Sequence, residues 1–153
     1  LKSNDNFIII YPNNDLGSKT ILMEYKRLEK NKKIKIFPSL KFEYFLTFLK
    51  NAEYIVGNSS SGIREASYYS TPAVDVGSRQ NNRIKGLSIF HTSNDCNSIL
   101  KGISLSKKFE SRESKNISPF GKGNSDKLFL NILNEGSIWL TDHQKQFQDI
   151  DYE

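Results

Sequence analysis

Short apolar runs alternate with helix-like segments along most of this chain. Five runs have the length of strands, at residues 7–11, 34–37, 54–56, 73–76 and 87–91. Between them, apolar side chains recur every three or four residues, as in Phe42, Phe45, Leu46 and Leu49. Strands that alternate with helices over short connections predict a parallel sheet with helices on both faces. We therefore expect an α/β fold of the Rossmann-like kind.

The loop after the third apolar run has the composition of an anion-binding turn. It reads Gly57-Asn58-Ser59-Ser60-Ser61-Gly62 and precedes a segment at about 62–69 that we expect to be helical. The first amides of a helix lack partners within it, and its dipole places partial positive charge there. The glycines allow close approach of the backbone, and the serine hydroxyls can cap the helix or donate to phosphate. The same residues also fit an ordinary capped helix, so both interpretations stay open.

Two further features fit a ligand at this loop. Glu65 would stand about a turn and a half into the helix, roughly 7 Å along its axis from Ser60, where its carboxylate can accept hydrogen bonds from a ribose. Ligands of parallel sheets bind beyond the carboxyl ends of the strands. We expect three polar loops to leave the sheet at this edge, namely those after Phe37, at Asn58 and at Gly77. The third of these loops carries Arg79 and Arg83. A guanidinium matches two phosphate oxygens, although an exposed loop arginine is the commoner case.

Composition narrows the classes of ligand and compartment. The net charge of +5 permits an anionic ligand or nucleic acid, but the basic segment 26–35 has no interleaved aromatics to stack bases. A single cysteine, Cys96, cannot form an internal disulfide, and two histidines and one cysteine make no metal cluster at recognised spacings. There is no apolar run of membrane-spanning length and no secretory signal pattern. We expect a cytoplasmic protein without metal, cofactor, membrane or nucleic acid.

The chain begins with Leu1 rather than methionine and enters its first strand almost at once, so we expect a piece cut from a longer protein. Asn94 or Asp95 is predicted to cap a helix that reaches about Lys107. We expect a single domain over 1–153, in which 137–153 form a terminal helix, at about 137–148, and an acidic tail.

Three stretches resemble the hydrolysing UDP-N-acetylglucosamine 2-epimerases, the enzymes that open sialic acid and related nonulosonate synthesis. They are Gly57-Asn58-Ser59-Ser60-Ser61-Gly62-Ile63-Arg64-Glu65, Thr71-Pro72-Ala73-Val74, and Gly77-Ser78-Arg79-Gln80 with Arg83. The resemblance extends from Tyr11-Pro12-Asn13 to Phe120-Gly121-Lys122-Gly123-Asn124. Non-hydrolysing epimerases share the fold but carry an acidic, glycine-rich first loop and lack the Gly-Ser-Arg-Gln segment, which favours the hydrolysing branch.

The resemblance implies a two-domain, glycosyltransferase-B-like fold of which this chain is the C-terminal, UDP-binding domain. By position, Ser59 and Ser60 would contact the diphosphate, and Glu65 the ribose. Arg79 would meet the phosphate end, and the backbone of Leu40 the uracil. Further candidates in the same loops are Asn58, Ser61, Gly62 and Arg83. The family's catalytic carboxylates lie on the N-terminal domain and its histidine motif lies upstream of Leu1, so this chain would bind without turnover.

The implied reaction of the intact protein converts UDP-N-acetylglucosamine and water to N-acetylmannosamine and UDP. Its implied partners are the missing N-terminal domain and further copies of the same protein. Two alternatives of the same architecture stay open, the UDP-sugar-binding half of a non-hydrolysing epimerase or of a glycosyltransferase. A non-catalytic module whose loop only caps a helix is an alternative of another class.

Overall fold

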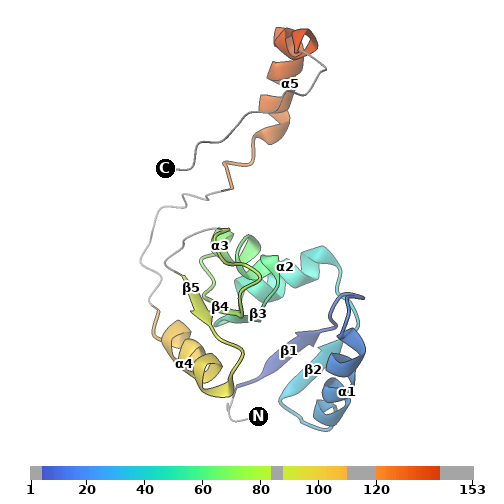
Figure 1. Cartoon of the computed structure of the whole chain (residues 1–153), viewed down its shortest axis with the longest axis vertical. Coiled ribbons are helices and arrows are strands. Elements are labelled where there is room, and N and C mark those ends of the chain that lie inside the picture. Colours follow the sequence, from blue (N-terminus) through green and yellow to red (C-terminus); the bar gives the residue numbers. More distant parts are fainter. Residues whose placement is uncertain (1–4, 84–87, 110–119, 142–153) are drawn as a thin grey trace, which may run out of the picture. The chain divides into compact units, whose positions relative to one another are not determined.

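The computed structural model describes residues 5–83, 88–109 and 120–141 (Figure 1). The chain divides into two compact units, Leu1–Arg112 and Glu113–Glu153. The first unit carries the strands and the loops of interest, and the second carries a helix near the C-terminus. Each unit is described by itself.

All strand pairings among the described residues of the first unit are parallel. The strands are β1 (Phe7–Ile10), β2 (Ile34–Phe37), β3 (Ile55–Gly57), β4 (Ala73–Val76) and β5 (Ile89–Thr92). β1 pairs with β2, and the other three form a sheet in the order β3-β4-β5. The predicted parallel α/β architecture is therefore confirmed, with the strands grouped into two hydrogen-bonded sheets (Figure 1).

Side chains join the two sheets where β1 and β3 begin. The rings of Phe7 and Tyr54 meet edge to face with their centroids 6.4 Å apart. The Tyr54 hydroxyl donates to Asp5 Oδ2 at 2.8 Å, and Lys107 at the end of a later helix pairs with the same carboxylate. This cluster connects the segment before β1 to the start of β3.

Helices cover both faces of the three-stranded sheet. These helices are α2 (Phe42–Lys50), α3 (Glu65–Tyr68) and α4 (Cys96–Lys107), whereas α1 (Ser18–Leu28) connects β1 to β2. On one face, Leu49 of α2, Ala66 of α3 and Ala73 of β4 form a buried cluster. On the other face, a Cβ placed on Gly102 of α4 would lie 2.9 Å from Val74 Cγ1, so α4 packs this closely because the residue is glycine.

The helix expected at about 62–69 is broken into two short pieces. Ser60–Gly62 form a 3₁₀ turn, and α3 begins only at Glu65, after Arg64 departs from ideal helical angles with a ψ of −71°. Ser70 then takes a positive φ of 56° and ends the segment. Glu65 is thus the first residue of α3 rather than a position a turn and a half inside a helix.

The start and end of α4 confirm the prediction from sequence. Asp95 is its N-cap, with its Oδ1 accepting from the Ser98 amide at 2.9 Å, and the helix ends at Lys107. The Ser93 hydroxyl donates to the other carboxylate oxygen at 2.5 Å. Both bonds favour the ionised carboxylate, and the pKa of Asp95 lies below its ordinary value, with the Ser93 bond as the larger cause.

The second unit contains α5 (Ser125–Glu135). Gly136 ends α5 in the left-handed region, with a φ of 71°, and Ser137–Leu140 form a 3₁₀ turn. Of the helix expected at about 137–148, Ser137–Leu140 take this 3₁₀ form, and Thr141 is extended. Positions 142–148 lie outside the described residues.

No helix among the described residues is both long enough and apolar enough to cross a bilayer.

Candidate functional site

A row of three paired residues crosses the three-stranded sheet near the carboxyl ends of its strands. Gly57 of β3 pairs with Asp75 of β4, and Asp75 pairs with His91 of β5. Neighbours in register point to the same face of a sheet, and alternation places Asp75 on the face of Ala73. A Cβ on Gly62 would lie 3.6 Å from Ala73 Cβ, so the 3₁₀ turn covers this same face.

The Gly/Ser loop, residues 57–62, is closed by hydrogen bonds among its own residues. Ser59 is the N-cap of the 3₁₀ turn, and its Oγ accepts from the Ser61 amide at 3.3 Å and the Ser61 hydroxyl at 3.0 Å. The Gly62 amide donates to the Ser59 carbonyl at 3.1 Å. The amides of Ser61 and Gly62 thus have partners inside the loop. These bonds are neutral and Ser59 is exposed, so a charged ligand can exchange with them.

Glu65 keeps one carboxylate oxygen without a partner. Its Oε2 is buried, and no hydrogen bond reaches it from the described residues. Two other buried side-chain oxygens among the described residues share this condition, Asp75 Oδ1 and Gln80 Oε1. All three are acceptors on elements next to the Gly/Ser loop, so what they lack is a donor, such as a hydroxyl group or a water.

A small cavity of about 30 Å³ lies beneath the Gly/Ser loop. Its lining includes Gly57, Ser59 and Gly62 from the loop and Asp75 from β4. A cavity of this size has room for a water molecule. Such a water can donate to a buried acceptor in the lining.

Gln80 links the loop after β4, residues 77–83, to the Gly/Ser loop. Its side chain is 1% exposed, and its Nε2 donates to the Asn58 carbonyl at 2.8 Å. The sequence identified Gln80 only as part of a motif and gave it no role. Its burial in a polar loop depends on a contact with a residue 22 positions away, which no local pattern reveals.

Arg79, next to Gln80, reaches toward the loop that follows β1. Its Nη1 lies 3.9 Å from Asp15 Oδ2, and both side chains are more than half exposed. An exposed pair at this distance holds Arg79 weakly, so the guanidinium stays accessible to an anion. The contact shows that the loops after β1 and β4 meet at the same edge.

Leu40 and Arg83 belong to loops at the same edge, but fewer contacts connect them to the candidate site. Leu40 is half-buried between β2 and α2. Arg83 is exposed, and its amide donates to the Gln80 carbonyl at 3.3 Å. Among the described residues, no side-chain hydrogen bond or ion pair joins either to the Gly/Ser loop.

Asp75 and His91 form a pair that the sequence analysis missed. Asp75 is 3% exposed, and its Oδ2 lies 2.9 Å from His91 Nδ1. An ionised carboxylate only accepts, so Nδ1 carries the proton and Nε2 is directed away from the pair. The signal available in the sequence was an aspartate inside an apolar strand, Ala73-Val74-Asp75-Val76.

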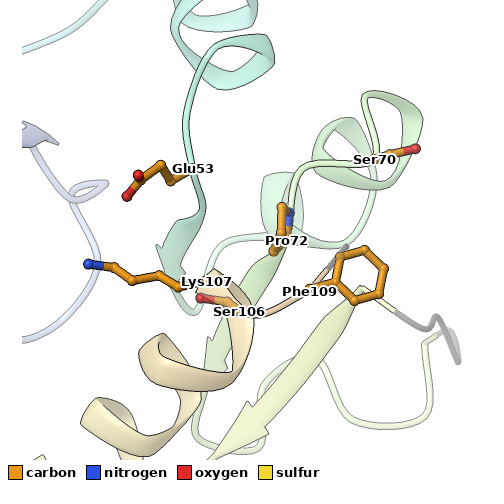
Figure 2. A pocket seen from close by; sticks show the side chains of 6 residues that line it. All are labelled: Glu53, Ser70, Pro72, Ser106, Lys107 and Phe109. Carbon is orange, nitrogen blue, oxygen red and sulfur yellow. The ribbon is translucent and has the colours of Figure 1, made fainter. Parts of the chain in front are cut away.

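A larger cavity, of about 220 Å³, lies at the opposite end of the strands (Figure 2). Glu53 and Pro72, which precede β3 and β4, line it together with Ser106, Lys107 and Phe109 near the end of α4, and with Ser70. The Ser106 hydroxyl is bonded to a carbonyl of its own helix, and Lys107 pairs with Asp5. These two polar groups are thus engaged elsewhere, and the cavity is remote from the Gly/Ser loop. In the described parts of the chain, no group of three or more His, Cys, Asp or Glu side chains has a metal-binding arrangement.

Comparison with known proteins identifies the family of this chain. Residues 1–134 match the family described as UDP-N-acetylglucosamine 2-epimerase. The chain belongs to this family. It is 42% identical over 154 residues to the UDP-N-acetylglucosamine 2-epimerase of Neisseria meningitidis serogroup B, an alignment that covers 97% of this chain and 39% of that protein. The chain thus spans about two fifths of this relative's length.

The chain is also similar to a further 2-epimerase and to a solved epimerase structure. The chain is 36% identical over 104 residues to the GDP/UDP-N,N'-diacetylbacillosamine 2-epimerase (hydrolyzing) of Campylobacter jejuni, covering 67% of this chain and 24% of that protein. A crystal structure of Methanocaldococcus jannaschii UDP-GlcNAc 2-epimerase, in complex with UDP-GlcNAc and UDP, superposes with a TM-score of 0.63 at 25% identity. The superposition covers 80% of this chain and 34% of the Methanocaldococcus jannaschii chain. The chain therefore corresponds to a part, the C-terminal half, of the glycosyltransferase-B-like fold of the UDP-N-acetylglucosamine 2-epimerases.

Proposed function

We propose that this chain is the UDP-binding domain of a hydrolysing UDP-N-acetylglucosamine 2-epimerase. The observation that carries the proposal is Glu65 Oε2, a buried acceptor without a partner beside the Gly/Ser loop. A ribose hydroxyl is a donor that fits this acceptor. The family membership and the bound UDP of the Methanocaldococcus jannaschii relative support the choice of nucleotide.

Each loop at this edge would hold a different part of the nucleotide. Ser59 and Ser60 would donate to the diphosphate, with Ser61, Gly62 and Asn58 close by in the same loop. Arg79 would exchange its weak pair with Asp15 for the phosphates, and Arg83 follows in the same loop. The backbone of Leu40 would meet the uracil. No metal or cofactor has a role in this arrangement.

The charge that develops on UDP gives these residues a part in the reaction. When the bond between carbon 1 of the sugar and the diphosphate oxygen breaks, the electron pair leaves with UDP. Donors that already face the diphosphate, here the serine hydroxyls and Arg79, would stabilise that charge as it forms. The carboxylates that invert carbon 2 and direct water would come from outside this chain, which would bind without turnover.

The hydrolysing reaction is supported by the Gly-Ser-Arg-Gln segment at residues 77–80 and by the relative named as hydrolyzing. The intact enzyme would act in the cytoplasm as an oligomer. A non-hydrolysing epimerase is the second candidate, since the most extensive match above bears the plain epimerase name.

The products of the full-length protein distinguish the candidates. With UDP-N-acetylglucosamine and no acceptor, the proposed enzyme releases free UDP and N-acetylmannosamine in equal amounts. A non-hydrolysing epimerase instead gives the nucleotide-linked epimer without free UDP. A glycosyltransferase gives no N-acetylmannosamine, and it transfers the sugar and releases UDP only when an acceptor is added. If the protein fails to bind UDP by calorimetry, the proposed site is wrong whatever the products.

A further inference from the structure

We infer that Gln80 is a positioning residue that holds the Gly/Ser loop and the loop at residues 77–83 at a fixed distance from each other. The inference rests on the proposed function, because it concerns how the UDP site is assembled. Gln80 lies on the same loop as Arg79, and its side chain donates to the carbonyl of Asn58, one residue before Ser59. The hydrogen bond is 2.8 Å long and runs between loops that follow β3 and β4.

The orientation of the Gln80 amide is fixed by its partner. A backbone carbonyl only accepts, so the group that faces Asn58 must be the NH₂. A flipped amide would bring two acceptors together and leave both donors of Gln80 without this carbonyl. The side chain therefore acts as a directional link rather than as a generic polar contact.

The burial of Gln80 separates this role from simple core packing. The side chain is 1% exposed, yet its Oε1 has no partner among the described residues. A buried acceptor without a partner destabilises the folded state, so an apolar side chain of the same length would pack here at least as well. Glutamine at this position gains its advantage from the bond to the Gly/Ser loop.

This link would set the spacing between the groups that grip the diphosphate. Arg79 is exposed, and its ion pair with Asp15 is long, so its own contacts position it weakly. Gln80, the next residue, is fixed through Asn58 to the loop of Ser59 and Ser60. Groups held in place before a ligand arrives bind it with less loss of conformational freedom.

The test uses Gln80→Met in the full-length protein, because methionine matches glutamine in length and lacks the donor. We expect UDP affinity to fall by about five- to tenfold, the loss that follows when one hydrogen bond to the diphosphate is weakened but not removed. The melting temperature should stay within about 2 °C of the native value, since the change also removes the unpartnered oxygen. Arg79→Ala should then weaken UDP binding less in the Gln80→Met background than in the native background.

Asn81→Ala is the matched control, since Asn81 is an exposed neighbour on the same loop. It should leave UDP affinity unchanged. Native affinity in a folded Gln80→Met protein overturns the inference, and so do fully independent effects of Gln80→Met and Arg79→Ala. Gln80 would have only a packing role if Gln80→Met lowered the melting temperature strongly while Arg79→Ala weakened UDP binding equally in both backgrounds.

Hydrogen exchange keeps the inference distinguishable from the proposed function. Amides of residues 58–62 should exchange faster in Gln80→Met than in the native protein or in Asn81→Ala. If the native protein binds no UDP, the proposed function fails while faster exchange still supports the link between the loops. If exchange at 58–62 is unchanged, the link itself is wrong.

Discussion

His91 donates from its Nδ1 to the buried carboxylate of Asp75 at 2.9 Å, across the paired strands β4 and β5. The side chain of His91 is 46% exposed, whereas that of Asp75 is 3% exposed, so the histidine covers a carboxyl group that solvent scarcely reaches. The other oxygen of Asp75 has no partner among the described residues. The stability of this part of the sheet therefore depends on the histidine.

We predict that His91→Leu lowers the free energy of unfolding by about 2 kcal/mol, because it leaves a buried carboxylate without its hydrogen bond. His91→Asn is the matched variant, since the asparagine Nδ2 can stand where Nδ1 stood. It should lose less than half as much. Urea unfolding measures both variants, and equal losses would show that the imidazole acts by packing instead.

Ser60→Ala should weaken UDP binding by roughly 1–2 kcal/mol, the order expected for the loss of one hydrogen bond to the ligand. Titration calorimetry measures the change. The exposed Ser104 on α4 provides the control, and Ser104→Ala should bind UDP as the native protein does. Equal affinity of Ser60→Ala and the native protein would remove Ser60 from the proposed site.

Glu65→Gln should weaken UDP by roughly 1–2 kcal/mol, because the amide replaces one of the two acceptor oxygens with a donor. Binding of 2′,3′-dideoxy-UDP should change little, since it lacks the ribose hydroxyls. Glu53→Gln, at the remote cavity of Figure 2, is the control for removing a negative charge. The same loss for both nucleotides would contradict a ribose contact.

Asp15→Asn should strengthen UDP binding by about two- to threefold at low salt, because it removes a negative charge and frees Arg79. The gain should fade as salt screens the exposed charges. Glu24→Gln makes the same change in net charge at a pair with Arg27, 2.9 Å apart, away from the site. If Glu24→Gln gives the same gain, overall charge and not Arg79 is the cause.

Asp95 gives the protein a pH-dependent contribution to stability. The pKa of Asp95 is lowered from its ordinary 3.8, first by the Ser93 hydroxyl and then by the Ser98 amide. A lowered carboxyl pKa stabilises the fold above the ordinary value, and the contribution is lost as pH falls through the lowered value. Asp95→Asn should therefore be less stable than the native protein at pH 7, with a difference that shrinks in acid. A difference that is constant with pH in urea unfolding would show that the charge is irrelevant.

Local patterns predicted the strands and the longer helices. The apolar run at Ala73-Val74-Asp75-Val76 became β4, and Asp95 capped α4, because both signals act within a few residues. The break before Glu65 was missed. It falls at Arg64, between the 3₁₀ turn and α3, and the turn lies against Ala73, a contact between separate elements that no local pattern reveals.

The polar contacts of the site were predicted less well than the elements that carry them. Serine hydroxyls and Arg79 are visible as candidates because their chemistry suits phosphate at a strand-loop boundary. The bonds of Gln80 to Asn58 and of His91 to Asp75 join residues 22 and 16 positions apart. They exist only once the register of β3, β4 and β5 is set, which the sequence pattern leaves undetermined.

The junction between the two sheets also has a consequence for unfolding. β1 and β3 meet through Phe7, Tyr54 and Asp5 rather than through a backbone ladder among the described residues. Contacts of this kind break independently of the ladders on either side, so the β1–α1–β2 segment can open as a cooperative unit of its own. Native-state exchange would then show two protection levels, with the slower one in β3–β5, and the Gly/Ser loop and the loop at residues 77–83 would keep their shape while the first strands detach.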